Sequence, residues 1–204
     1  MEIKARDLGK DFGEKSIFRD IGFDLREGQS LAIVGPNGSG KTTLVKILCG
    51  LIRPSTGSIQ YFDNGGEIDR DHIFAHIGLV GPYLELYEDL TARENIHFFV
   101  RMRDLTGVRD KVDDLLEFFK LAGREDDAVK TYSSGMRQRL KYIVALLHDP
   151  KILFLDEPTS NLDRQGIERV YQVMAEQKSN RILLIATNDQ EDLKYGDEQI
   201  AVGS

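Results

Sequence analysis

Residues 35 to 42 read GPNGSGKT, and this segment constrains the fold more than any other part of the chain. It matches the pattern G-x-x-x-x-G-K-[ST], in which glycines let the backbone fold so that its N–H groups surround phosphate oxygens. An apolar run, SLAIV, precedes the segment, and a stretch that reads as a helix, TTLVKILCGL, follows it. We therefore predict a strand, a phosphate-binding loop and a helix in direct succession.

The residue types of this loop each suit a role in phosphate binding. Lys41 supplies a positive charge to the β- and γ-phosphates, and the hydroxyl of Thr42 is placed to bind Mg²⁺. The alternative, an ordinary glycine-rich turn, does not explain the strand and helix patterns on either side. The predicted nucleotide contacts in the loop are Gly35, Pro36, Asn37, Gly38, Ser39, Gly40, Lys41, Thr42 and Thr43.

A second functional segment, KILFLDEP, ends an apolar run with two adjacent acids. The run predicts a buried strand that carries Asp156 to the carboxyl-terminal edge of a sheet, where α/β proteins bind ligands. Asp156 is then the expected partner of Mg²⁺, and Glu157 is the candidate to polarise a water that attacks the γ-phosphate. Alternatively, both acids only cap the turn that follows.

Composition and charge exclude several classes of function. The 204 residues carry a net charge of -7, whereas a nucleic-acid partner requires a basic surface. The single cysteine, Cys49, cannot form an internal disulfide and is expected to be buried. No apolar stretch is long enough to span a membrane, and the first residues lack the apolar core of a signal peptide. We expect a cytoplasmic protein that reaches a membrane only through a partner and does not work on nucleic acid.

The order of the patterns predicts an α/β core with two additional lobes. Residues 2–34 and 57–63 look rich in strands, and a helical middle follows them. Two short apolar runs, KILFLDEP and RILLIATN, are separated by a further helical pattern, which is typical of buried parallel strands. We interpret residues 1–204 as a single domain.

Two helices of the middle region have recognisable ends. Thr91 and Glu94 have the spacing of a capping box, which predicts that a helix begins after Thr91. Residues 108–123 carry apolar side chains at helical spacing, and Gly123 is expected to end that helix.

Residues 132–139 read YSSGMRQR and indicate another helix that begins with serine and glycine. One nucleotide needs only one phosphate loop, so this second helix start requires an explanation. A helix N-terminus with small residues suits contact with an anion. The alternative is a plain N-cap by one of the serines.

The order of GPNGSGKT, YSSGMRQR and ILFLDEPTSNLD resembles the ATP-binding subunit of ABC transporters over nearly the whole chain. The resemblance implies a P-loop NTPase core with a parallel sheet and an N-terminal antiparallel β lobe, mainly residues 1–30 and 57–70. It also implies an inserted α-helical lobe of about residues 83–147. ATP and Mg²⁺ are the implied cofactors, and the implied partners are an integral membrane transporter subunit and a second copy of the ATPase.

The resemblance assigns roles to further residues. Ser133, Ser134 and Gly135 would bind the ATP held by the opposite subunit, which explains the second helix start. Phe12 stands where the family has an aromatic side chain that stacks on adenine, although it could instead be a core residue of the β lobe.

Two loops are implied to contact other chains. Residues 160–163, SNLD, match the loop that contacts the other ATPase subunit, and Asp163 could also cap the next helix. Residues 82–87, PYLELY, lie where the family docks the membrane subunit, although their apolar side chains could instead pack the helical lobe.

Three departures from the family pattern affect hydrolysis. Pro82 stands where the family has a metal-contacting glutamine, and a proline side chain cannot bind Mg²⁺. Asn188 stands where the family usually has a histidine, and an amide can hydrogen-bond phosphate but cannot take a proton. In the helix that begins with YSSGMRQR, Met136 stands where the family has a glutamine, and Ser134 stands where it has a glycine. We expect slow or partner-dependent hydrolysis that is not abolished. The predicted catalytic residues are Lys41, Glu157 and Asn188.

The leading hypothesis is an ATPase subunit that drives a membrane exporter by ATP-driven dimerisation. The S-x-G-M-R-Q-R form and the small size resemble exporter subunits, among them the haem-exporter ATPase of cytochrome c maturation. One alternative is a nucleotide-gated clamp that dimerises on ATP and rarely hydrolyses it, which Pro82 and Asn188 favour. Another is a soluble ABC ATPase of an assembly system.

Overall fold

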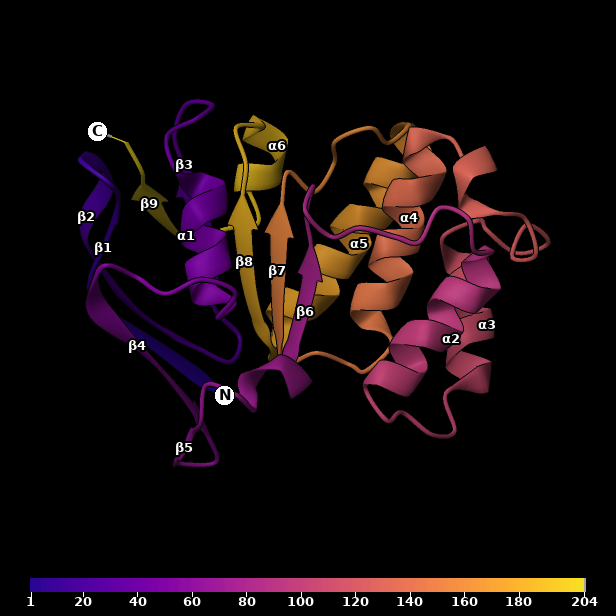
Figure 1. The fold of residues 1–204 in the computed structure, drawn as a ribbon, viewed down its shortest axis with the longest axis horizontal. Helices are drawn as coiled ribbons and strands as arrows, with labels where there is room; N and C mark the ends of the chain where they lie inside the picture. Colours follow the sequence, from indigo (N-terminus) through magenta and orange to yellow (C-terminus); the bar gives the residue numbers. More distant parts are fainter. Residues whose placement is uncertain (204) are drawn as a thin grey trace.

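A parallel sheet forms the centre of the molecule in the computed structural model, which describes residues 1–203 (Figure 1). Its strands lie in the order β6-β7-β8-β3-β9 and all neighbouring pairs are parallel. The bounds are β3 (Ser30–Val34), β6 (Ile77–Val80), β7 (Ile152–Asp156), β8 (Ile182–Ala186) and β9 (Glu198–Ala201). Every residue of β7 and β8 is buried, as expected for apolar strands covered on both faces.

Alternate residues of the central strands pack into two hydrophobic clusters, one on each face of the sheet. Phe154 belongs to the cluster that contains helix α1 (Lys41–Leu48), whereas Leu155 belongs to the cluster that contains helix α5 (Arg164–Asn180). Figure 1 shows α1 in front of the sheet and α5 behind it. This alternation follows from the two-residue period of a strand. The central strands are therefore packed on both faces of the sheet.

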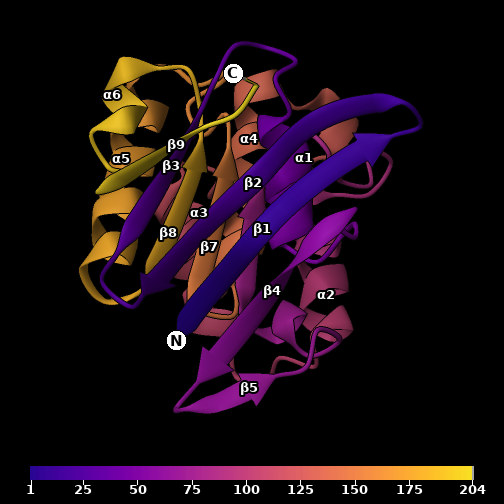
Figure 2. The same ribbon diagram turned by 90° about the vertical axis from the view of Figure 1, so that its left-hand side faces the viewer.

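An antiparallel sheet covers the side of the core that contains α1 (Figure 2). Its strand order is β2-β1-β4-β5. The bounds are β1 (Glu2–Phe12), β2 (Lys15–Arg26), β4 (Thr56–Asp63) and β5 (Gly66–Ile68). The predicted antiparallel β lobe is confirmed. The turn between β1 and β2 lies at the same end of the molecule as the loop after β3 (Figure 1).

The helical lobe follows β6 and confirms the predicted insertion. It contains α2 (Ala92–Met102), α3 (Arg109–Phe118), the short 3-10 helix η2 (Val129–Thr131) and α4 (Ser134–Leu146). Thr91 Oγ1 accepts a hydrogen bond from the Glu94 N–H at 3.1 Å, and the Glu94 carboxylate accepts one from the Thr91 N–H at 2.8 Å, so the predicted capping box is confirmed. The expected end at Gly123 is wrong, because α3 ends at Phe118 and Lys120 is already left-handed with a φ of 57°.

The remaining elements are short. Strand β6 has four residues, of which Gly78 is one, and no sequence pattern indicated it. The 3-10 helix η1 (Ile73–Ala75) precedes it, and α6 (Gln190–Leu193) follows β8. Cys49 is buried, as predicted. Within residues 1–203, no helix combines the length and the apolar character that a transmembrane segment requires.

A half-buried polar contact attaches the helical lobe to the core. The Arg103 guanidinium donates hydrogen bonds to the carbonyl oxygens of Phe74 at 2.7 Å and Ile77 at 3.2 Å. Its Nη1 also lies 3.1 Å from His148 Nε2. Burial, and after it the charge of Arg103, lowers the pKa of His148 to about 4. His148 is therefore neutral in the folded protein at neutral pH.

Acid should lower the free energy of unfolding through His148. The unfolded chain binds a proton at His148 near the ordinary pKa of about 6.5, whereas the folded chain binds it only near pH 4. Stability is then lost as the pH falls through this window, by about 2–3 kcal/mol at pH 4.5. Urea unfolding at pH 7 and pH 4.5 should show a smaller loss for His148→Gln, which stays neutral. An equal loss in both proteins would contradict this origin of the acid sensitivity.

Candidate functional site

The predicted phosphate loop connects β3 to α1, and its glycines take conformations that other residues avoid. Gly38 and Gly40 have φ values of 80° and 111°. A Cβ atom on Gly40 would also collide with the side chain of Ile17 in β2. Gly40 is the N-cap of α1 and has no side chain that could occupy the first N–H groups of the helix. These N–H groups and the positive end of the helix dipole are therefore available to an anion.

The Lys41 ammonium is buried at the centre of the site. Its side chain is 6% exposed, and Nζ lies 4.0 Å from Oε1 of Glu157. Nζ donates hydrogen bonds to the Gly35 carbonyl oxygen at 2.7 Å and to Oδ1 of Asn188 at 3.2 Å. The fold thus brings together the three residues predicted to be catalytic, which lie far apart in the sequence.

Thr42 and Asp156 join the start of α1 to the end of β7. Thr42 Oγ1 donates a hydrogen bond to Asp156 Oδ2 at 2.6 Å, and Asp156 is 1% exposed. Its other oxygen, Oδ1, is buried and has no hydrogen-bond partner within residues 1–203. Burial raises the pKa of this carboxyl group. A buried carboxylate oxygen without a partner is destabilising unless a cation binds it.

This pair of oxygen donors fits Mg²⁺. The ion prefers oxygen ligands and is usually held by one or two carboxylates together with substrate phosphates. In the part of the chain that the structure describes, no group of three or more His, Cys, Asp or Glu side chains could hold a metal. Thr42 and Asp156 would therefore hold Mg²⁺ jointly with the phosphates of a nucleotide.

Glu157 lies in a strained turn directly after β7. Its φ of 53° is costly for a residue other than glycine, and such strain is concentrated at functional sites. Its N–H donates a hydrogen bond to the Ala186 carbonyl oxygen at the end of β8, at 2.8 Å. The carboxylate is 41% exposed, and burial raises its pKa while Lys41 lowers it. Within the described residues neither Glu157 nor Asp156 caps the following turn through its carboxylate, so that alternative is wrong.

Asn188 connects the end of β8 to the phosphate loop. Its Oδ1 accepts the hydrogen bond from Lys41, and its Nδ2 donates one to Asn37 Oδ1 at 2.7 Å. Both ends of the amide are thus bound to residues of the loop. Asn37 and Asn188 therefore lie together beside the Lys41 ammonium.

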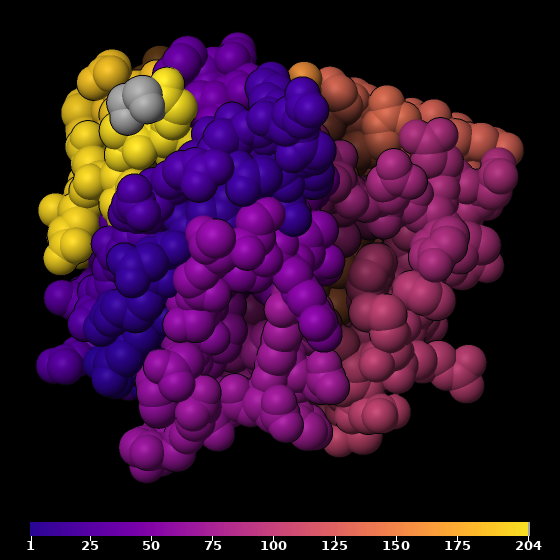
Figure 3. Space-filling model, turned by 60° about the vertical axis from the view of Figure 1, so that its left-hand side comes forward, coloured from indigo at the N-terminus to yellow at the C-terminus, as the bar shows by residue number. Residues whose placement is uncertain are grey.

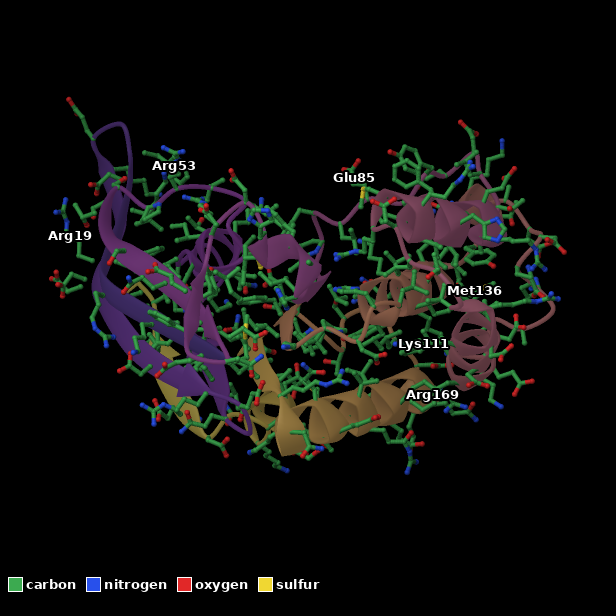
Figure 4. All side chains as sticks on the ribbon, turned by 90° about the horizontal axis from the view of Figure 1, so that it is seen from below. Arg19, Arg53, Glu85, Lys111, Met136 and Arg169 are labelled. Atoms are coloured by element: carbon green, nitrogen blue, oxygen red, sulfur yellow. The ribbon has the colours of Figure 1, made fainter. Side chains whose placement is uncertain are left out.

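The serine-rich helix start lies at the same end of the molecule as the phosphate loop but on the other side of β6 and β7 (Figure 1). Ser133 caps α4, because its Oγ accepts a hydrogen bond from the Met136 N–H at 3.2 Å. The N-cap alternative is therefore confirmed for Ser133, while Ser134 beside it is exposed. Figure 4 shows Met136 among the helices of the helical lobe. The fold does not bring Ser133, Ser134 and Gly135 to the phosphate loop of the same chain.

The loop after β7 packs against this helix start. A Cβ atom on Gly135 would lie 2.9 Å from the Asn161 carbonyl oxygen, so a larger residue would push the two segments apart. Asp163 caps α5 by accepting a hydrogen bond from the Gly166 N–H at 2.9 Å, and it also pairs with Arg139 of α4. The predicted cap is confirmed. The same carboxylate links the loop after β7 to α4.

Phe12 is an exposed aromatic residue near the phosphate loop. Its side chain is 55% exposed, so the alternative of a core residue is wrong. It pairs with Lys15 at the tip of the β1–β2 hairpin, and Ile17 of the same hairpin contacts Gly40. Lys10 Nζ lies 4.9 Å from the centre of the ring. The open ring face is suited to stacking with a flat base.

Pro82 is exposed in a loop whose supporting residues no sequence motif indicated. Lys141 of α4 donates a hydrogen bond to the Gly81 carbonyl oxygen at 3.1 Å. The ring of Tyr83 packs on Gly81, and Lys46 Nζ lies 4.4 Å from the centre of that ring. The Tyr83 hydroxyl is buried with no hydrogen-bond partner among the described residues. These contacts hold the loop at the end of β6 beside Asp156.

Comparison with known proteins identifies relatives along most of the chain. Residues 18–160 match the sequence model of the ABC transporter family. The uncharacterized ABC transporter ATP-binding protein YhcH of Bacillus subtilis is 40% identical over 171 residues, which are 82% of this chain and 55% of that protein. The daunorubicin resistance ATP-binding protein DrrA3 of Streptomyces coeruleorubidus is 38% identical, over 79% of this chain and 52% of that protein. The chain spans about half the length of these two curated relatives.

Solved structures have the same fold. The ATP-binding subunit of an ABC transporter superposes with a TM-score of 0.87 at 26% identity and covers 99% of this chain and 86% of that one. An ATP-binding cassette in a dimeric post-hydrolysis state, bound to ADP and Pi, gives a TM-score of 0.85 at 25% identity and covers 98% and 94%. The predicted fold class is thus confirmed.

Loss of the Phe12 ring should weaken binding of the base but not of the phosphates. Phe12→Ala should lower ATP affinity about tenfold, since stacking of a base on an aromatic ring contributes about 1–3 kcal/mol. Phe12→Tyr keeps the ring face and should bind like the wild type. Calorimetric titration with inorganic tripolyphosphate, which has no base, should give the same affinity for all three proteins. A matching loss of tripolyphosphate affinity would contradict the stacking role.

Proposed function

Since the chain belongs to the ABC transporter family, we propose that it is the ATP-binding and ATP-hydrolysing subunit of a membrane exporter. The observation that carries this proposal is the convergence of Glu157 and Asn188 on the buried Lys41, next to the Thr42–Asp156 pair. Relatives named for daunorubicin resistance, linearmycin resistance and Nod factor export support export as the direction of transport. Haem as the cargo stays a prediction.

ATP binding follows from the electrostatics of the phosphate loop. The N–H groups at the start of α1 and the Lys41 ammonium bind phosphate oxygens, and the exposed ring of Phe12 receives the adenine. Thr42 and Asp156 would hold Mg²⁺, which would supply positive charge next to the phosphates. The buried Oδ1 of Asp156 gains a partner in this way.

Hydrolysis requires a group that orients a water and accepts its proton. Glu157 is suited to this role, because its half-exposed carboxylate lies beside the loop and its pKa is raised by burial. The nearby Lys41 ammonium opposes that rise in the pKa. Asn188 can donate a hydrogen bond to the γ-phosphate but cannot exchange a proton with it. Turnover is therefore slow.

A second copy of the chain completes the site. The phosphate loop and the segment Ser133–Gly135 lie at one end of the molecule and on opposite sides of it (Figure 1). Two copies related by a two-fold axis can each place this helix start over the nucleotide held by the other. The exposed Ser134 and the positive end of α4 then face the triphosphate. A dimeric cassette bound to ADP and Pi among the structural relatives supports this arrangement.

Exposed aromatic side chains on the helical lobe are suited to a membrane subunit. Tyr87 and Phe98 are exposed, and their rings pack edge to face with centres 4.8 Å apart. Leu84 and Leu86, in contrast, are half-buried against the core of the helical lobe. The leucines of residues 82–87 thus pack the lobe, and the exposed Tyr87–Phe98 pair supports docking of a partner at this loop.

A cavity beside residues 82–87 offers polar contacts to the same proposed membrane subunit. A cavity of about 380 Å³ lies between residues 84–88 and the start of α4, and its lining includes Glu85 and Lys141. Figure 3 shows the β lobe and the helical lobe side by side with a furrow between them. Figure 4 places Glu85 beside the helical lobe, away from Arg53 in the β lobe. We place the protein at the cytoplasmic face of a membrane, held there by its partner.

Glu157→Gln tests the proposal. With ATP and Mg²⁺, this variant should form a stable dimer in light-scattering chromatography, and its turnover should fall at least 100-fold, since it lacks the general base. Glu168→Gln on α5, an exposed acid paired with Arg164, serves as the control and should behave like the wild type. If the Glu157→Gln protein stays monomeric at high concentration with ATP and Mg²⁺, the proposed dimer is contradicted. If dimerisation occurs but turnover hardly changes, the protein is instead a nucleotide-gated clamp.

Pro82 and Asn188, the two residues that depart from the family pattern in the site, should account for the slow ATP turnover. Asn188→His introduces a group that can carry a charge near the γ-phosphate, and Pro82→Gln introduces an oxygen that can contact Mg²⁺. The double variant should hydrolyse ATP several-fold faster than the wild type in a phosphate-release assay, with both purified in the same way. An unchanged rate, together with unchanged ATP affinity, would show that slow turnover has another cause.

A further inference from the structure

A fully buried carboxylate, Asp192 in helix α6, adjoins the site but has none of the roles described above. Its Oδ2 accepts hydrogen bonds from Thr187 Oγ1 at 2.8 Å and from Thr159 Oγ1 at 3.2 Å. Its Oδ1 accepts one from the Tyr171 hydroxyl of α5 at 3.1 Å. Three hydroxyl donors satisfy a group whose burial alone would be very costly. Figure 1 shows α6 at the upper end of β8.

The two threonines belong to the two turns that carry catalytic residues. Thr159 is the second residue after Glu157 in the turn that follows β7. Thr187 directly precedes Asn188 at the end of β8. One oxygen atom, Asp192 Oδ2, therefore receives a hydrogen bond from each turn. The backbone hydrogen bond from the Glu157 N–H to the Ala186 carbonyl oxygen joins the turn after β7 to the end of β8 as well.

We propose that Asp192 is a positioning residue that holds Glu157 and Asn188 in one fixed geometry through Thr159 and Thr187. This inference rests on the proposed ATP hydrolysis, in which both residues act at the γ-phosphate. The turn at Glu157 needs an anchor, because its φ of 53° is strained and persists only if its surroundings enforce it. A displacement of about 1 Å can lower a rate about 100-fold, so a shared anchor has a measurable effect.

Tyr171 offers a matched control in the same network. Its hydroxyl binds the other oxygen of Asp192, and it belongs to α5 rather than to a catalytic turn. Its ring stacks on Tyr195 with centres 5.0 Å apart, so Tyr171→Phe keeps its packing. This variant leaves the buried carboxylate with one donor fewer while both turns stay attached. A purely structural role of Asp192 predicts that losing any of its three donors has the same effect.

Steady-state kinetics distinguish a positioning role of Asp192 from a purely structural one. Thr159→Val and Thr187→Val should each lower kcat about tenfold, while the KM for ATP stays within about twofold because the phosphate loop is untouched. Serine at either position keeps the hydroxyl and should restore kcat. Tyr171→Phe should lower kcat by less than about twofold. If it lowers kcat as much as the valine variants do, or if serine fails to restore the rate, the inference is overturned.

Hydrogen–deuterium exchange tests the anchor without requiring turnover. Asp192→Asn should speed amide exchange in residues 157–161 and 187–189, and Thr159→Val only in the first segment. Tyr171→Phe should change neither. If the wild-type chain does not hydrolyse ATP, the proposed function fails, but this measurement still decides whether the anchor exists. Unchanged exchange in both segments of Asp192→Asn would overturn the inference.

Discussion

The buried ammonium of Lys41 is the charge on which the rest of the site depends. Removing an ammonium group from water costs several kcal/mol, so it persists only where other groups compensate it. The compensation comes from the carbonyl oxygens of Gly35 and Pro36, the amide of Asn188 and the carboxylate of Glu157. These groups follow β3, β8 and β7, which are adjacent in the central sheet. The strand order therefore makes the site possible.

The two neighbouring acids after β7 differ because their surroundings differ. Asp156 is buried, accepts a hydrogen bond from Thr42 and has one oxygen without a partner among residues 1–203, an environment that suits a cation ligand. Glu157 turns away through a left-handed backbone conformation and exposes its carboxylate beside Lys41. Groups of the same chemical type acquire different roles when burial and charge separate their properties. A single strained residue thus separates the proposed Mg²⁺ site from the proposed position of the attacking water.

The two lobes place complementary surfaces on opposite sides of one end of the molecule. The β lobe carries Phe12 near the phosphate loop, and the helical lobe carries Ser134 on a helix start that its own chain does not use. The ion pair of Arg139 with Asp163 ties that helix to the loop after β7. Movement of the helical lobe would therefore also move this loop, which follows the turn at Glu157. In the proposed exporter this connection links the partner surface to hydrolysis.

Local patterns in the sequence were sufficient for the phosphate loop, the three apolar strands of the sheet and the capping box, because each depends on residues a few positions apart. The tertiary structure decided what depends on distant contacts. Phe12 is exposed at the tip of the β1–β2 hairpin, and α3 ends at Phe118, just before the left-handed Lys120. The anchoring of Thr159 and Thr187 by Asp192 joins three segments that no motif relates. A hydrogen bond to a buried carboxylate depends on where the folded chain brings its donors, and spacing along the sequence does not determine that.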